Sequence, residues 1–125
     1  MTKRDYIYWG ATGLLALAQF ASGTLYLLAE DMAEAFRHLG FPDYFRVQLG
    51  IAKIVGSIAL LAPLPRFLKE WTYFGFITSF VSAFIAHTAV GDPIGDILPP
   101  VIVLGVLAVS YVTYRQRQAA PANDE

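Results

Sequence analysis

Four long apolar stretches, separated by short polar connections, dominate the pattern of this sequence. The first covers residues 7–29 and contains no charged side chain. At about 1.5 Å per residue, a helix of this length crosses a hydrocarbon core of about 30 Å. We predict an all-α membrane protein whose four spans pack as an up-down-up-down four-helix bundle, because each backbone in lipid must satisfy its own hydrogen bonds. The other three spans cover residues 44–62, 71–90 and 97–114.

The polar segments between and after these stretches add two features. The connection EDMAEAFRHLG places Met32, Phe36 and Leu39 on one helical face. This spacing predicts a short amphipathic helix on the outer surface, between the first and second spans. The last residues, 119–125, are polar and contain a proline, which favours a disordered tail. Residues 1–118 are expected to form one membrane domain.

Positive side chains gather at one end of the predicted bundle. The loops at the other end are rich in aspartate and glutamate. Cytoplasmic loops of membrane proteins carry an excess of lysine and arginine, so the N and C termini are predicted to be cytoplasmic. The positive residues at this end are Lys3, Arg4, Arg66, Lys69, Arg115 and Arg117.

The composition agrees with a membrane protein and excludes several classes of function. Of 125 residues, 56% are hydrophobic and only 15% are charged, whereas soluble domains carry about 25% charge. The net charge of −1 leaves no basic surface for nucleic acid. The sequence has no cysteine, which excludes disulfides and thiol relays. It also lacks HExxH, GxSxG, P-loop and dinucleotide-binding motifs, so no enzyme class is indicated.

One lysine interrupts the second span. Lys53 lies in LGIAKIVGSIALLAP, about 13 Å from the predicted outer end of its helix. A lysine at mid-span raises the insertion free energy by about 2.5–3.5 kcal/mol, so such a charge usually faces the bundle interior. Gly50, Gly56 and Ser57 share its helical face and allow another helix to approach closely. We predict that Lys53 points into the bundle.

Other polar side chains fall at compatible depths and suggest a pocket in the outer half. We expect Gln19 and His87 to lie near Lys53, with aromatic side chains on the same helical face as His87. Two other interpretations stay open: Lys53 extends to the outer interface, or it forms a structural ion pair. No metal site is indicated. The candidate ligand-binding residues are Lys53, His87, Gln19, Phe80, Phe84 and Ser57.

Three segments carry a resemblance to a known family. EAFRHLGFPDYFRVQLGIAKIVGSIALL, LKEWTYFGF and AHTAVGD resemble the DoxX-like family of small bacterial membrane proteins, and the resemblance runs from about Tyr8 to Tyr114. It implies a four-helix, multi-pass protein of the bacterial plasma membrane. The wider DoxX group takes its name from a subunit of a thiosulfate:quinone oxidoreductase, and distant relatives include an assembly chaperone for nicotinic acetylcholine receptors. The resemblance implies no catalytic residues.

Two functional hypotheses follow. In the first, the chain is a non-catalytic subunit, assembly factor or small lipophilic-ligand binder, with the lipid bilayer and other membrane proteins or further copies of itself as partners. In the second, it is a quinone-linked membrane oxidoreductase subunit, whose quinone accepts hydrogen bonds from Lys53 and His87. A weaker third possibility is proton or solute transfer through the pocket of Gln19, Lys53 and His87.

Overall fold

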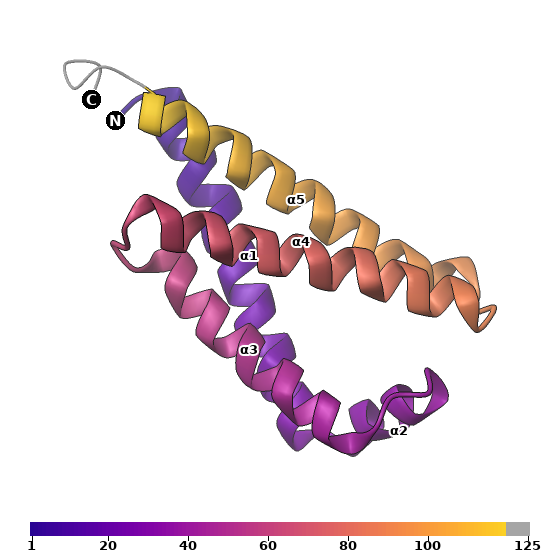
Figure 1. Cartoon of the computed structure of the whole chain (residues 1–125). Coiled ribbons are helices and arrows are strands. Elements are labelled where there is room, and N and C mark those ends of the chain that lie inside the picture. The colour runs from indigo at the N-terminus through magenta and orange to yellow at the C-terminus, as the bar shows by residue number, and fades with distance from the viewer. Residues whose placement is uncertain (120–125) are drawn as a thin grey trace.

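The chain is entirely helical over the part that the structure describes. The computed structural model describes residues 1–119, which form five helices and no strands. This confirms the all-α prediction, while nearly all of the predicted disordered tail lies outside the described residues. The helices are α1 (Lys3–Leu28), α2 (Glu30–His38), α3 (Asp43–Leu61), α4 (Arg66–Ala89) and α5 (Ile94–Ala119) (Figure 1).

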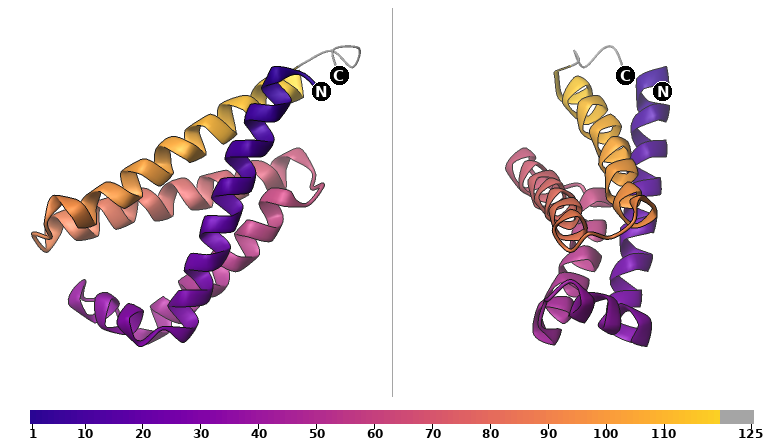
Figure 2. Two further views of the ribbon diagram at one scale, coloured as in Figure 1. Left: turned by 180° about the vertical axis from the view of Figure 1, so that it is seen from behind. Right: turned by 90° about the vertical axis from the view of Figure 1, so that its right-hand side faces the viewer.

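The four long helices form two pairs that meet at one end of the molecule. Helix α1 packs along α3, and α4 lies beside α5. The start of α1 and the end of α5 lie together, so both ends of the described chain are on the same side (Figure 1). Figure 2 shows the two pairs diverging from this end, with α2 at the opposite end of the molecule.

Helices α1, α4 and α5 begin before their apolar stretches, because the polar residues in front of these stretches are also helical. Helix α1 begins at a capping box, in which the Thr2 hydroxyl accepts from the Asp5 N–H at 3.3 Å and the Asp5 carboxylate accepts from the Thr2 N–H at 2.9 Å. Helix α5 begins at Ile94, three residues before the predicted span. Pro99 and Pro100 therefore lie inside α5, one turn later than the first-turn position that its predicted start implied.

The predicted amphipathic helix is present as α2. Phe36 and Ala33 are buried on one face, and Gly40 follows the helix with a φ of +87°, which glycine adopts without strain. The Phe36 ring packs against Tyr26 of α1, with ring centroids 4.9 Å apart. Helix α2 is therefore held by its apolar face against the end of α1.

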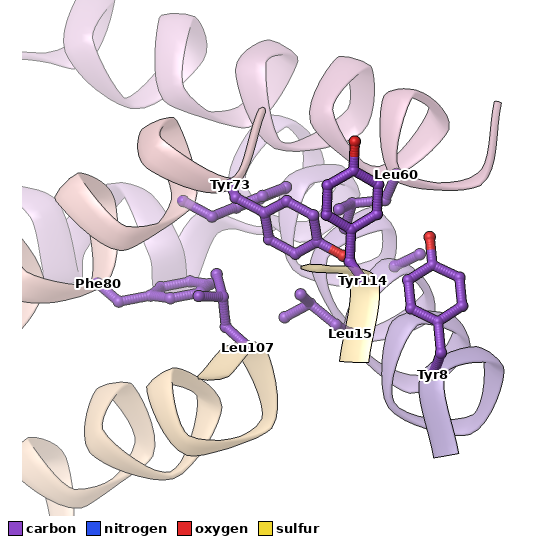
Figure 3. Packing of buried hydrophobic residues seen from close by; sticks show 9 residues of the cluster. Tyr8, Leu15, Leu60, Tyr73, Phe80, Leu107 and Tyr114 are labelled. Atoms are coloured by element: carbon purple, nitrogen blue, oxygen red, sulfur yellow. The ribbon is translucent and has the colours of Figure 1, made fainter. Parts of the chain in front are cut away.

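A core of aromatic and aliphatic side chains fills the region where the two pairs meet. It includes Leu15 of α1, Leu60 of α3, Tyr73 of α4 and Leu107 of α5, each at most 2% exposed (Figure 3). Three hydroxyl groups inside this core are paired with one another, whereas the buried Tyr114 hydroxyl has no hydrogen-bond partner within residues 1–119. The Ser110 hydroxyl lies 2.7 Å from the Tyr73 hydroxyl and 2.6 Å from that of Thr12, which satisfies groups that have no access to water.

Glycines set the closest approaches between helices. Gly23 of α1 faces Gly50 of α3, and a Cβ on Gly23 would lie 2.7 Å from the Gly50 carbonyl oxygen. A Cβ on Gly56 would lie 2.7 Å from the Phe76 ring of α4. The small residues around Lys53 thus allow α1 and α4 to approach α3, as the sequence predicted.

Three of the helices are long and apolar enough to cross a membrane. These are α1, α3 and α5, by length and composition. Helix α4 has 24 residues but is not one of the three, and its first turns contain Lys69 and Glu70. Large apolar side chains such as Leu17 (70% exposed) and Trp71 (69%) point outward, as expected for surfaces that face lipid.

Candidate functional site

Lys53 lies buried at the contact between α1 and α3. Its side chain is 7% exposed, which confirms the prediction that it points into the protein. The Nζ atom donates to the Gln19 Oε1 atom at 2.8 Å and lies 3.4 Å from the Ser22 hydroxyl. Lys53 forms no ion pair with any residue of the range 1–119. A structural ion pair with another of these residues therefore does not describe this lysine.

Two aromatic rings complete the surroundings of the amine. The Nζ atom lies 4.7 Å from the centroid of the Tyr26 ring and 5.8 Å from that of Phe80. The negative face of an aromatic ring attracts a cation at these distances. An ammonium group has three N–H donors, and Gln19 and Ser22 account for two of them. The third donor has no hydrogen-bond partner among the described residues.

The structure brings some of the predicted site residues to Lys53 and separates others. Gln19 and Phe80 adjoin the amine. Ser57 is close in sequence, but its hydroxyl donates to the Lys53 backbone carbonyl at 2.7 Å, so it serves its own helix. Phe84 is 42% exposed and faces a groove between α4 and α5.

This groove is apolar and has a volume of about 210 Å³. Phe80 links it to the lysine, because the same side chain lines the groove and lies near Nζ. The groove is lined by Phe80, Val81, Phe84, Pro100, Val101 and Leu104.

His87 belongs to a different cluster, in the turn after α4. Its Nδ1 atom lies 2.6 Å from one carboxylate oxygen of Asp92, and the His38 Nε2 atom lies 2.6 Å from the other. The expected approach of Lys53 to His87 or to the acidic loops is therefore not what the structure shows. Hydrogen bonds from His38 and His87 hold the pKa of the Asp92 carboxyl below its ordinary value of 3.8. This cluster ties α2 to the α4–α5 turn.

Several of these contacts were missed by the sequence reasoning. Ser22 and Tyr26 follow Gln19 at helical spacings of three and seven, so they share its face and were detectable from that pattern. The pairing of His38 with Asp92 left no comparable signal, because these residues are 54 positions apart, one on α2 and the other in the turn between α4 and α5.

The chemistry that this arrangement offers is binding. A buried cation beside aromatic rings can donate to a carbonyl, carboxylate or phosphate oxygen. No nucleophile is paired with a general base near Lys53 in the described range. Among residues 1–119, no group of three or more His, Cys, Asp or Glu side chains is placed to hold a metal ion.

Comparisons with known proteins give one match. The model of the DoxX-like family matches residues 10–110, which includes α2, α3 and α4 and most of α1 and α5. No curated protein and no solved structure matches the chain.

Proposed function

The chain belongs to the DoxX-like family, and on that premise we propose that it is a non-catalytic membrane protein that binds a lipophilic small molecule through Lys53. One observation carries this proposal: Lys53 is 7% exposed and forms no ion pair within residues 1–119. A mid-span lysine raises the insertion free energy by about 2.5–3.5 kcal/mol. A charge kept at that cost, without a carboxylate beside it, favours a functional role.

The ligand that fits has an electron-rich oxygen and an apolar body. The oxygen would accept the remaining N–H of Lys53, and the body would extend past Phe80 toward the apolar groove between α4 and α5. Binding sites of this kind are mostly apolar, with few polar groups that fix the orientation. Association with other membrane proteins or with a second copy is a separate proposal, which would use the outward apolar faces.

An equilibrium binding experiment tests the role of Lys53. Radiolabelled palmitate and decylubiquinone serve as probes, carrying a carboxylate and carbonyl oxygens respectively. We expect Lys53→Met to lower the affinity for the bound probe about tenfold or more, because a hydrogen bond to a charged group is lost. Lys3→Met, the same change at an exposed lysine, is the matched control. Failure of both probes to bind, or equal affinity in Lys53→Met, contradicts the proposal.

A quinone is the second candidate ligand, favoured by the aromatic rings of Tyr26 and Phe80 beside the amine. The quinone hypothesis drawn from the sequence needs His87 as the second hydrogen-bond donor to the quinone, yet His87 Nδ1 is bound to Asp92. His87→Phe should therefore leave decylubiquinone affinity unchanged, while Lys53→Met reduces it. A loss of affinity in His87→Phe would support the quinone hypothesis drawn from the sequence instead.

We also propose that α4 is a fourth span and that both termini are cytoplasmic. Helix α4 lies beside α5 and has a similar length, and the start of α1 and the end of α5 lie together at the end rich in lysine and arginine. The sequence has no cysteine, so a single cysteine substitution reports the accessibility of its own position, without labelling of native thiols. In intact cells, a membrane-impermeant maleimide should label Asp31→Cys and Gly91→Cys but not Thr2→Cys. Labelling of Thr2→Cys would reverse the orientation.

A further inference from the structure

A second cavity lies at the other end of α4 from Phe80, between the start of α4 and the end of α5. Its volume is about 460 Å³, within the range of small-molecule sites. The walls carry two guanidinium groups, two side-chain amides and an apolar surface. These are Arg66, Arg115, Gln116, Gln118, Tyr111 and Val112.

The two arginines of this cavity are poorly satisfied by the protein. Among residues 1–119, the carboxylate beside them is that of Glu70, whose Oε1 atom lies 3.9 Å from Arg66 Nε and 3.5 Å from Arg115 Nη1. These distances exceed those of good N–H···O hydrogen bonds. Glu70 Oε1 accordingly has no hydrogen-bond partner within residues 1–119, while Oε2 accepts from the Tyr111 hydroxyl at 2.8 Å.

Most of the donor capacity in the cavity is therefore free. Each guanidinium has five N–H donors in a planar arrangement. Arg115 uses one of them on the Tyr111 hydroxyl at 3.0 Å, and both side chains are more than half exposed. Within the described part of the chain, two positive charges surround one carboxylate, so these residues together carry a positive charge. A guanidinium pair with free donors matches the oxygens of a phosphate group.

The position of the cavity favours a lipid as the source of that phosphate. Phe67 and Trp71 lie in the first two turns of α4, the helix that begins at Arg66, and both are exposed, with ring centroids 5.6 Å apart. Aromatic side chains of this kind gather at the membrane interface. Val112 is exposed on the cavity wall and offers an apolar surface to an acyl chain. Basic pockets between spans at this level bind anionic headgroups.

We propose that Arg66 and Arg115 form a binding site for the phosphate of an anionic phospholipid at the cytoplasmic end of α4 and α5. The inference rests on the membrane placement proposed above but not on ligand binding by Lys53. The two sites involve different ends of α4, so removal of the arginines leaves palmitate affinity unchanged.

The test uses the full chain in neutral detergent, with native mass spectrometry to count bound phosphatidylglycerol and phosphatidylcholine. We expect selective retention of phosphatidylglycerol. Arg66→Gln and Arg115→Gln should each weaken it about fivefold, and the double variant about twenty-five-fold. Arg37→Gln is the matched control, because Arg37 is 56% exposed and lies 3.7 Å from Asp43 in a similarly loose pair.

Two further arms make the result decisive. The Arg66→Lys/Arg115→Lys variant keeps both charges and should keep the preference for phosphatidylglycerol. Millimolar inorganic phosphate should not displace the lipid, and displacement would assign the site to a soluble phosphate compound instead. Equal phosphatidylglycerol affinity in the wild type and the double Gln variant, or an equal loss in Arg37→Gln, overturns the proposal.

Discussion

Replacing Gly23 with alanine should force α1 and α3 apart at the point where Lys53 is held. The new Cβ would lie 2.7 Å from the Gly50 carbonyl oxygen, 3.0 Å from Ile54 Cγ1 and 3.1 Å from Lys53 Cβ. The carbonyl belongs to the backbone of α3, which cannot yield locally as a flexible side chain can. Overpacking of this kind typically costs about 1–3 kcal/mol of stability.

Gly13→Ala is the matched control on the same helix, because a Cβ there meets nothing within 4 Å. Alanine favours a helix over glycine by about 0.8–1.0 kcal/mol, and this gain applies equally to both variants. The difference between them therefore isolates the steric effect. We expect Gly23→Ala to be less stable than Gly13→Ala by about 1–3 kcal/mol.

The assay is unfolding of the purified chain in dodecyl maltoside micelles with increasing dodecyl sulfate, followed by tryptophan fluorescence. Gln19 lies one helical turn before Gly23 and accepts the Lys53 hydrogen bond, so palmitate affinity should fall in Gly23→Ala and stay unchanged in Gly13→Ala. Equal free energies of unfolding for the two variants would refute the reasoning about the glycine contact.

Two further predictions concern single charged groups. Insertion of segment 43–61 into microsomal membranes should become more favourable by about 3 kcal/mol in Lys53→Leu, and an unchanged insertion efficiency would contradict the membrane placement of this lysine. Asp92→Asn should speed amide hydrogen exchange in residues 30–38, whereas the exposed Asp96→Asn should not. Because the pKa of Asp92 is lowered in the folded protein, its contribution to stability is present above about pH 3.8 and is lost as the pH falls through the lower folded value. If α2 instead detached from the α4–α5 turn near neutral pH, the Asp92 carboxylate would not be the group that holds it there.

The sequence predicted the helices because helix formation and lipid exposure are local properties. Apolar runs located the four long helices, and the spacing of Phe36 located α2. The helix ends were less accurate, because hydropathy marks the apolar part of a helix and not its last hydrogen bond. The capping box at Thr2 and the start of α5 at Ile94 both lie outside the apolar runs.

The sequence also determined that Lys53 faces inward, since glycines on its helical face allow close contact and a charge in lipid is costly. It also placed Gln19 near Lys53, and the two side chains are hydrogen-bonded. Only the tertiary structure decided the other neighbours: Ser22 and Tyr26 adjoin the amine, while His87 is bonded to Asp92 instead. Such contacts depend on how the helix pairs cross and diverge. A shift of one helical turn changes the partner of a side chain but leaves the hydrophobic pattern of each helix unaltered.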